Sequence, residues 1–257
     1  MEHHRQGAGK PLLLVHGLGG SRQSWDTIVA RLGSTRELIL LDLPGHGATP
    51  AEGDSGTFAG LARSLEAWLG AQGLAGVDMV GSSLGARLVL EMARRGKAGA
   101  AVSLDPGGFW AGWERHWVFT TLRASGAALR LGRPTLRLLA HTAAGRTALL
   151  AQLSARPWAL DGDLVERELK GLAATPTFDA LVADLAYGPP QEGPAHPNSG
   201  PVTIGWGRQD RLCLPSQAAR AQAAFPSARL HWFDGSGHFP MWDQPEETAA
   251  LILRATA

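Results

Sequence analysis

The residues whose types and spacing point most directly to chemistry form a Gly-x-Ser-x-Gly motif at Gly81, Ser83 and Gly85. An apolar stretch at residues 77–80 precedes the motif, and a stretch of helical pattern at residues 86–95 follows it. Between a strand and a helix, this spacing makes a sharp turn that strains the serine backbone and exposes its hydroxyl. Small neighbours leave room for the turn, and the helix N-terminus directs N–H groups toward negative charge. The motif therefore predicts a nucleophilic Ser83, with an ordinary glycine-rich turn as the alternative.

Four further loop motifs each follow an apolar stretch of the chain. They are His16-Gly17-Leu18-Gly19-Gly20, Asp42-Leu43-Pro44-Gly45-His46-Gly47, Gly207-Arg208-Gln209-Asp210 and Gly235-Ser236-Gly237-His238-Phe239-Pro240. Together with the serine motif, in this order and spacing, they resemble the α/β-hydrolase superfamily, as a capped member with a serine nucleophile. The resemblance covers residues 11–104 and 201–254. It implies an ester-type hydrolase with a serine, an acid and a histidine in that chain order.

A serine hydroxyl is a weak nucleophile until a base within hydrogen-bond reach removes its proton. Of the nine histidines, His238 is the expected base, because it follows the last predicted strand in a loop that matches the family's histidine loop. The resemblance gives Asp210 as the acid that orients the histidine. Asp105 is the alternative acid. If it is not the acid of the triad, Asp105 is expected to cap a turn. Asp243 is expected to begin the final helix region.

The resemblance also implies an oxyanion hole, which needs backbone donors aimed at a tetrahedral intermediate. The N–H of Leu84 follows the nucleophile, and the N–H of Leu18 is the expected second donor. Phosphate binding by residues 17–20 is the weaker alternative, because no lysine follows at the Walker spacing. The histidines of the first two loop motifs are expected to shape turns.

A serine nucleophile restricts the reaction class. Relatives that cleave carbon–halogen bonds or epoxides attack with aspartate, so Ser83 argues against both reactions. The favoured function is hydrolysis of a small, mostly apolar ester or lactone through an acyl-enzyme intermediate, with no cofactor and no metal. The alternatives are a C–C bond hydrolase of the meta-cleavage type, a cofactor-free lyase or perhydrolase with the same triad, and a ligand receptor without catalysis.

Two groups of side chains in the middle of the chain bear on substrate choice. Trp110, Trp113 and Trp117 recur at the spacing of one helical face, which favours either an aromatic pocket wall or plain packing of a cap. Most of the arginines nearby are expected to be solvated, although one of them is a candidate clamp for a substrate carboxylate. They are Arg115, Arg123, Arg130, Arg133, Arg137, Arg146 and Arg156.

The elements that must position these residues alternate between apolar and helical patterns, which predicts an α/β fold with a doubly wound, mostly parallel sheet. The predicted strands are residues 11–15, 37–43, 77–81, 99–104, 202–207 and 229–234. The predicted helices are residues 24–32, 57–72, 84–95, 215–225 and 245–254. By the resemblance, the family's first strand is missing and residues 2–6 form a short second one.

The alternation stops between residues 107 and 200, where helical stretches are broken at residues 132–134, 145, 156–157 and 175–176. This region resembles the helical cap that many family members insert over the active site. Prolines crowd its end and predict a return linker. We therefore expect a core of residues 1–106 and 201–257 and an inserted cap of residues 107–200.

Composition limits the remaining possibilities. With 24 Lys and Arg against 23 Asp and Glu, the net charge of +1 provides no field that favours nucleic acid or a charged membrane. The partner expected is a small-molecule substrate, with no nucleic acid and no membrane, and the oligomeric state stays open. The single cysteine cannot form an internal disulfide, and no signal peptide or membrane-spanning stretch of ~18 apolar residues is evident. These features predict a cytoplasmic enzyme.

Overall fold

The computed structural model describes residues 1–257 and contains a seven-stranded sheet in the order β1-β3-β2-β4-β5-β6-β7. The strands are β1 (His3–Gly7), β2 (Lys10–Val15), β3 (Arg36–Leu41), β4 (Asp78–Ser82), β5 (Ala101–Leu104), β6 (Val202–Gly207) and β7 (Arg229–Phe233). Strand β1 pairs antiparallel with β3, and all other neighbours are parallel. The predicted α/β fold class is confirmed, and the short strand expected at residues 2–6 is the edge strand β1.

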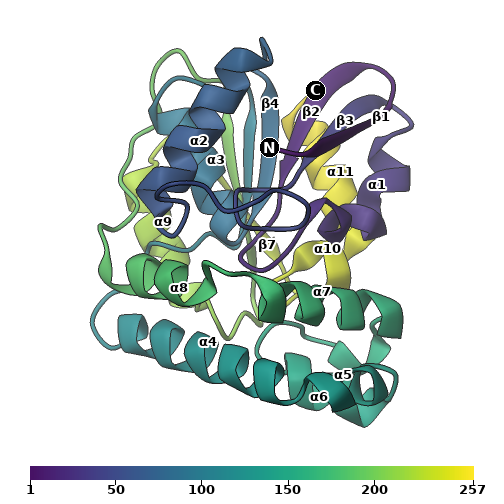
Figure 1. Cartoon of the computed structure of the whole chain (residues 1–257). Helices are drawn as coiled ribbons and strands as arrows, with labels where there is room; N and C mark the ends of the chain where they lie inside the picture. The colour runs from purple at the N-terminus through teal and green to yellow at the C-terminus, as the bar shows by residue number, and fades with distance from the viewer.

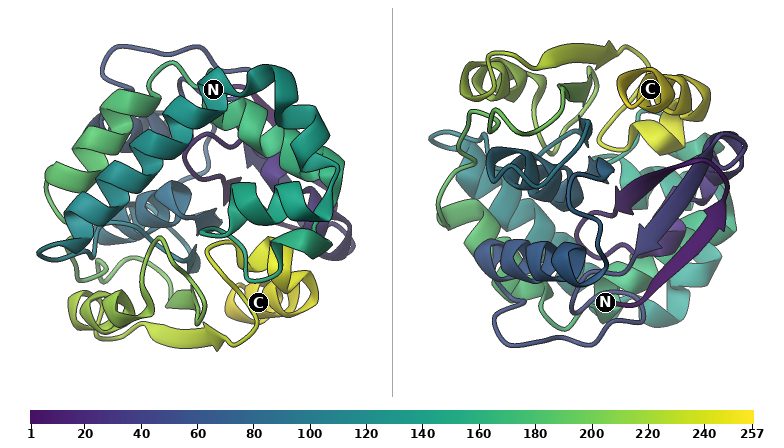
Figure 2. Two further views of the ribbon diagram at one scale, coloured as in Figure 1. Left: turned by 90° about the horizontal axis from the view of Figure 1, so that it is seen from below. Right: turned by 90° about the horizontal axis from the view of Figure 1, so that it is seen from above.

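Helices cover both faces of the sheet (Figures 1 and 2). On one side lie α1 (Asp26–Leu32), preceded by the 3-10 turn η1 (Arg22–Trp25), and α11 (Pro245–Ala255), preceded by α10 (Pro240–Asp243). On the other side lie α2 (Phe58–Ala71), α3 (Leu84–Arg94) and α9 (Ala218–Ala224), the last preceded by η3 (Pro215–Gln217). This two-sided arrangement follows from right-handed crossovers between parallel strands.

Alternate residues of the strands supply two separate apolar cores. In β2, Leu13 and Val15 pack with the α2, α3 and α9 side, whereas Leu12 and Leu14 pack with the α1 and α11 side. Successive side chains of a strand point to opposite faces, so a parallel sheet covered by helices must be apolar on both. The unbroken apolar run at residues 12–15 therefore indicates a central strand that is buried on both faces.

Five α-helices form the cap: α4 (Glu114–Leu131), α5 (Arg133–Ala140), α6 (Ala143–Leu150), α7 (Gly162–Ala174) and α8 (Phe178–Tyr187). The 3-10 turn η2 (Pro157–Ala159) separates α6 from α7. Figure 1 shows α7 and α8 between the sheet and an outer layer of α4, α5 and α6. The break expected at Gly145 is wrong, because Gly145 lies within α6 and donates its N–H to the capping hydroxyl of Thr142 over 3.1 Å.

The cap lies at the carboxyl ends of the parallel strands (Figure 1). In open α/β sheets, ligands bind in the crevice outside this edge, so the fold brings the loops after β2, β4, β6 and β7 toward one place. None of the helices is both long enough and apolar enough to cross a lipid bilayer.

Candidate active site

The turn between β4 and α3 holds Ser83 in a strained conformation. Its φ is 56° and its ψ is −115°, a region that non-glycine residues seldom occupy. The surrounding packing requires glycine on both sides. A Cβ at Gly81 would overlap the backbone of Gly85, and a Cβ at Gly85 would overlap the carbonyl group of Val15. The glycines of the motif thus permit the tight approach of β4, α3 and β2 that presents the Ser83 hydroxyl.

The structure brings Ser83, His238 and Asp210 into one hydrogen-bonded chain. The His238 Nε2 atom lies 2.8 Å from the Ser83 Oγ, and the His238 Nδ1 atom lies 2.7 Å from the Asp210 Oδ2. The side chains of His238 and Asp210 are fully buried. With Nδ1–H donating to the carboxylate, Nε2 is left to accept the serine proton, which is the tautomer that a general base requires.

Backbone amides hold the Asp210 carboxylate in place. Its Oδ1 atom accepts hydrogen bonds from the N–H groups of Leu212 over 2.8 Å and of Cys213 over 3.0 Å. The other oxygen is therefore free to face His238. Buried carboxylates are stable only when their lone pairs are satisfied in this way.

The alternative acid, Asp105, lies beside Asp210 but is not bonded to the histidine. Its Oδ1 atom accepts from the Gly207 N–H over 2.7 Å, and its Oδ2 atom has no partner. Burial, followed by the charge of Asp210, raises the pKa of Asp105 well above its usual range. The structure therefore brings Asp210, and not Asp105, to the histidine.

The loop after β2 approaches Ser83 closely. A Cβ at Gly17 would lie 3.1 Å from the Ser83 Cβ, so a larger residue would push the loop and Ser83 apart by a few tenths of an ångström. The N–H of the next residue, Leu18, makes no backbone hydrogen bond. Leu84 is the first residue of α3, where an N–H has no intrahelical acceptor. Leu18 and Leu84 line the same cavity as Ser83, so two free donors lie near its hydroxyl.

His16 fixes the conformation of this loop. Its Nδ1–H donates to the Gly17 carbonyl over 2.7 Å, and its Nε2 accepts from the Leu43 N–H over 3.0 Å. Burial lowers the pKa of His16 to about 4 and, with the neighbouring His16, that of His46 to about 3. Both imidazoles are therefore neutral structural groups, and His16 joins the loops after β2 and β3.

Asp243 has a different role from the one expected. It ends α10, and the final helix begins two residues later at Pro245. Its buried carboxylate accepts from the Gly237 N–H over 2.8 Å, from the Ala155 N–H over 2.9 Å and from the Ser154 hydroxyl over 2.6 Å. Because Ser154 and Ala155 belong to the cap, Asp243 joins the cap to the histidine loop.

The cavity above Ser83 has a volume of about 50 Å³ and a mainly apolar lining. Trp110 is one of its walls, but Trp113 and Trp117 lie on the surface with 65% and 38% of their areas exposed. Of the three tentative substrate contacts, Trp110 therefore lines the cavity, whereas Trp113 and Trp117 do not. The three tryptophans do not share one helical face, because α4 begins only at Glu114 and Trp110 lies in the loop before it.

Arg87 is the site residue that the sequence interpretation missed. None of the cap arginines lines this cavity, whereas Arg87 of α3 does, and it is only 2% exposed. Its guanidinium donates to the Pro189 carbonyl over 2.6 Å and stacks 3.8 Å from the Phe58 ring, while Nη1 has no partner. Burial lowers the pKa of Arg87 to about 10. Arg87 follows Ser83 by four residues, which places both on the same helical face, and this spacing could have indicated Arg87 from the sequence.

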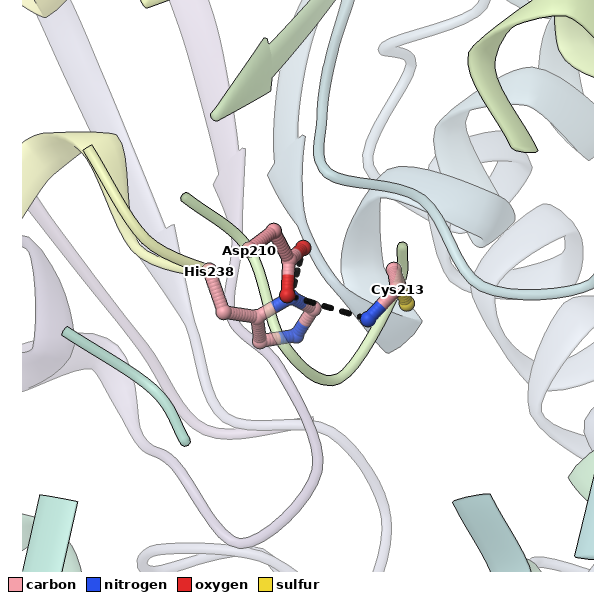
Figure 3. Close-up of side chains that lie close together, drawn as sticks. All are labelled: Asp210, Cys213 and His238. Carbon is pink, nitrogen blue, oxygen red and sulfur yellow. Dashed lines mark hydrogen bonds and ion pairs between the residues drawn. The ribbon is translucent and has the colours of Figure 1, made fainter. Parts of the chain in front are cut away.

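Cys213 lies beside the histidine and the acid (Figure 3). Asp210, Cys213 and His238 together offer three donor atoms of the kind that bind metals. However, burial raises the pKa of the Cys213 thiol well above its usual range, and a thiol must ionise to bind a metal. The His238 Nδ1 and Asp210 Oδ2 atoms are already bonded to each other. This donor set fits a hydrogen-bonded pair of histidine and carboxylate better than a metal site.

Comparison with known proteins identifies the family. A sequence profile of the alpha/beta hydrolase family matches residues 12–251, so the chain belongs to that family and is an enzyme of the α/β-hydrolase class.

Individual relatives and structures agree with this assignment. The chain is 27% identical over 266 residues to an uncharacterized protein of Mycobacterium tuberculosis, covering 96% of this chain and 75% of the relative. It is 29% identical over 280 residues to a 2-hydroxymuconate semialdehyde hydrolase of Pseudomonas putida, covering 97% and 88%. An esterase from Exiguobacterium antarcticum has the same fold, with a TM-score of 0.78 at 15% identity over 99% of this chain and 94% of the esterase.

Proposed function

We propose that this protein hydrolyses a small, mostly apolar ester or lactone, with Ser83 as nucleophile, His238 as general base and Asp210 as the acid that orients the histidine. One observation supports this most strongly: Ser83 Oγ, His238 Nε2, His238 Nδ1 and Asp210 Oδ2 form an unbroken chain through bonds of 2.8 Å and 2.7 Å. Such a chain activates a serine toward acyl carbon.

In the first half of the proposed reaction, the Ser83 oxygen attacks the substrate carbonyl carbon and its proton passes to His238 Nε2. The carbonyl oxygen becomes an oxyanion that accepts hydrogen bonds from the N–H groups of Leu18 and Leu84. His238 then gives its proton to the alcohol oxygen as the ester bond breaks. The alcohol of an ester leaves, whereas that of a lactone stays attached to the acyl chain, and in both cases the acyl group stays on Ser83.

In the second half, a water molecule takes the place of the alcohol. His238 removes one proton of this water while its oxygen attacks the acyl carbon, and the same two amides stabilise the second oxyanion. The Ser83–acyl bond breaks, and Ser83 recovers its proton from His238. The carboxylic acid leaves, or a hydroxy acid when the substrate is a lactone.

Hydrolysis of p-nitrophenyl acetate tests this proposal. The protein should release p-nitrophenol in an initial burst when deacylation is the slower half, and Ser83→Ala should lower turnover by roughly 10³-fold or more. Activity that survives in Ser83→Ala would show that another group is the nucleophile. Binding of substrate without any turnover would instead favour a receptor.

Arg87 supports a second candidate, hydrolysis of a C–C bond beside a ketone in an acidic substrate. Arg87 lines the cavity, and its buried Nη1 atom has no hydrogen-bond partner, so a substrate carboxylate that reaches this atom would gain a charge-assisted hydrogen bond. One similar protein is a 2-hydroxymuconate semialdehyde hydrolase. Turnover of that compound with a KM raised by Arg87→Gln, while the KM for p-nitrophenyl acetate stays constant, would favour this candidate.

A further inference from the structure

A second and larger cavity lies among the cap helices and opens to solvent, since Ser125, Ala128, Thr135, Leu139 and Ala148 in its lining are exposed. It has a volume of about 300 Å³, against about 50 Å³ for the cavity above Ser83. Three leucines line both cavities: Leu122 of α4, Leu153 after α6 and Leu172 of α7. The two cavities therefore meet at these side chains, all of which are partly buried. We call the larger one the cap cavity.

The lining of the cap cavity is suited to hydrocarbon. Its apolar walls come from the outer helices α4, α5 and α6 and from α7, through Leu129, Leu136, Leu139, Leu149 and Leu169. No charged side chain lines it. Of its three polar side chains, the Gln152 amide donates to the Thr121 hydroxyl over 3.0 Å and the Thr135 hydroxyl donates to the Gly132 carbonyl over 3.1 Å, which leaves the Ser125 hydroxyl. Polar ligand atoms would find few free partners here.

The shared leucines lie directly beside the reacting groups. The Leu153 carbonyl accepts a hydrogen bond from the His238 N–H over 2.8 Å. Leu172 packs against the loop after β2 so closely that a Cβ at Gly19 would lie 2.6 Å from its Cα. A ligand that extends from the cap cavity past these leucines thus arrives between the histidine and the loop after β2, where Ser83 lies.

The volumes indicate which part of a substrate each cavity holds. A cavity of 50 Å³ has room for only a few atoms beyond the reacting group, since one water needs about 10–15 Å³ on this scale. An apolar cavity of about 150 Å³ binds benzene, and the cap cavity is larger than that.

We propose that the cap cavity is a binding subsite for a linear hydrocarbon chain of the substrate whose carbonyl carbon reacts at Ser83. This inference rests on the proposed ester hydrolysis and assigns its substrate class, which is esters with a medium or long apolar chain. The chain can belong to the acyl group or to the alcohol, and the experiment below separates the two.

The test compares p-nitrophenyl acetate, butyrate, octanoate and decanoate with ethyl and octyl acetate. In the wild-type protein, kcat/KM should rise by about threefold to fourfold for each methylene that enters the cap cavity. Ala148→Phe places a ring in the cavity from α6. It should lower the ratio of kcat/KM for octanoate to that for acetate by about tenfold or more. If only the ratio of octyl to ethyl acetate falls, the chain in the cavity is that of the alcohol.

Ala127→Phe is the matched control, because Ala127 lies exposed on α4 and does not line the cavity. It should leave both ratios at their wild-type values. Ratios that are also unchanged in Ala148→Phe, or wild-type profiles that are flat with chain length in both the acyl and the alcohol series, would overturn the subsite while ester hydrolysis stands.

A binding measurement separates failure of the subsite from failure of the proposed function. The Ser83→Ala protein should enhance the fluorescence of cis-parinaric acid, and adding Ala148→Phe should weaken that binding by about tenfold. If the wild-type protein hydrolyses no ester but shows this pattern, the proposed function is wrong and the subsite is supported. Binding that Ala148→Phe does not weaken contradicts the subsite.

Discussion

The backbone N–H of His238 donates a hydrogen bond of 2.8 Å to the carbonyl oxygen of Leu153, so the histidine loop is bonded directly to the cap. Asp243 strengthens this connection from the other side, because it accepts from both the histidine loop and the cap. Leu153 also separates the two cavities. The position of the proposed base and the shape of the substrate site therefore depend on the same junction.

Removing the Asp243 carboxylate should loosen that junction. Asp243→Ala leaves the Gly237 and Ala155 N–H groups and the Ser154 hydroxyl without their acceptor. We expect the free energy of unfolding in urea to fall by about 3 kcal/mol or more. Asp234→Ala is the control, since Asp234 is 82% exposed and pairs only at the surface; its effect should stay below about 1 kcal/mol. If both substitutions lowered the free energy of unfolding equally, Asp243 would not stabilise the contact between the histidine loop and the cap.

The two buried carboxyl groups should respond differently to amide substitution. Asp210→Asn should lower kcat by about 10⁴-fold with the fold intact, because an amide favours the wrong tautomer of His238. Asp105→Asn should cost little activity, because the Asp105 carboxyl group makes no hydrogen bond to His238. Turnover of p-nitrophenyl acetate and far-UV circular dichroism measure the two effects. The reverse pattern would transfer the role to Asp105.

Glu168 of α7 should make the cap contact sensitive to pH. It accepts a hydrogen bond from the Ser24 hydroxyl over 2.8 Å, and burial raises its pKa from 4.5 to about 7. Between these values the unfolded chain has released the proton and the folded protein keeps it. Stability should therefore fall as pH rises from 4.5 to about 7 and then level off, by on the order of 3 kcal/mol in total.

Glu168→Gln cannot ionise and should lose this part of the pH dependence. Urea unfolding of both proteins at about pH 5 and about pH 8 measures the difference. If the free energy of unfolding changes equally with pH in the wild type and the variant, Glu168 is not the cause of the pH dependence.

The tryptophans of the cap should separate into one pocket residue and two surface residues. Trp110→Leu enlarges the cavity above Ser83, so it should change the ratio of rates on p-nitrophenyl butyrate and acetate. Trp113→Leu alters a side chain that is 65% exposed, and it should shift stability by less than about 0.5 kcal/mol and leave the ratio constant. A changed ratio in Trp113→Leu would place that ring at the substrate.

Local sequence rules predicted the core well because each of its features has a local cause. Apolar runs such as residues 12–15 mark central strands, and the glycines around Ser83 mark a turn that no larger residue allows. The proximity of Ser83, Asp210 and His238 follows once parallel strands end at one edge of the sheet.

The cap and the junctions with it were less predictable, because they depend on contacts between distant segments. Helical periodicity at Trp110 did not reveal that α4 begins only at Glu114. Nothing near Asp243 indicated that its carboxylate bonds to Ser154, 89 residues away. The cap cavity exists only once α4, α5, α6 and α7 pack together.

The most direct test of the central claim is covalent labelling of Ser83. An organophosphonate with a p-nitrophenyl leaving group should add one phosphonyl group per chain, because only an activated serine displaces that leaving group readily. Peptide mass spectrometry should find the group on Ser83, Ser83→Ala should remain unlabelled, and Ser82→Ala should be labelled like the wild type. Labelling that persists in Ser83→Ala, or that disappears in Ser82→Ala alone, would contradict the assignment of the nucleophile.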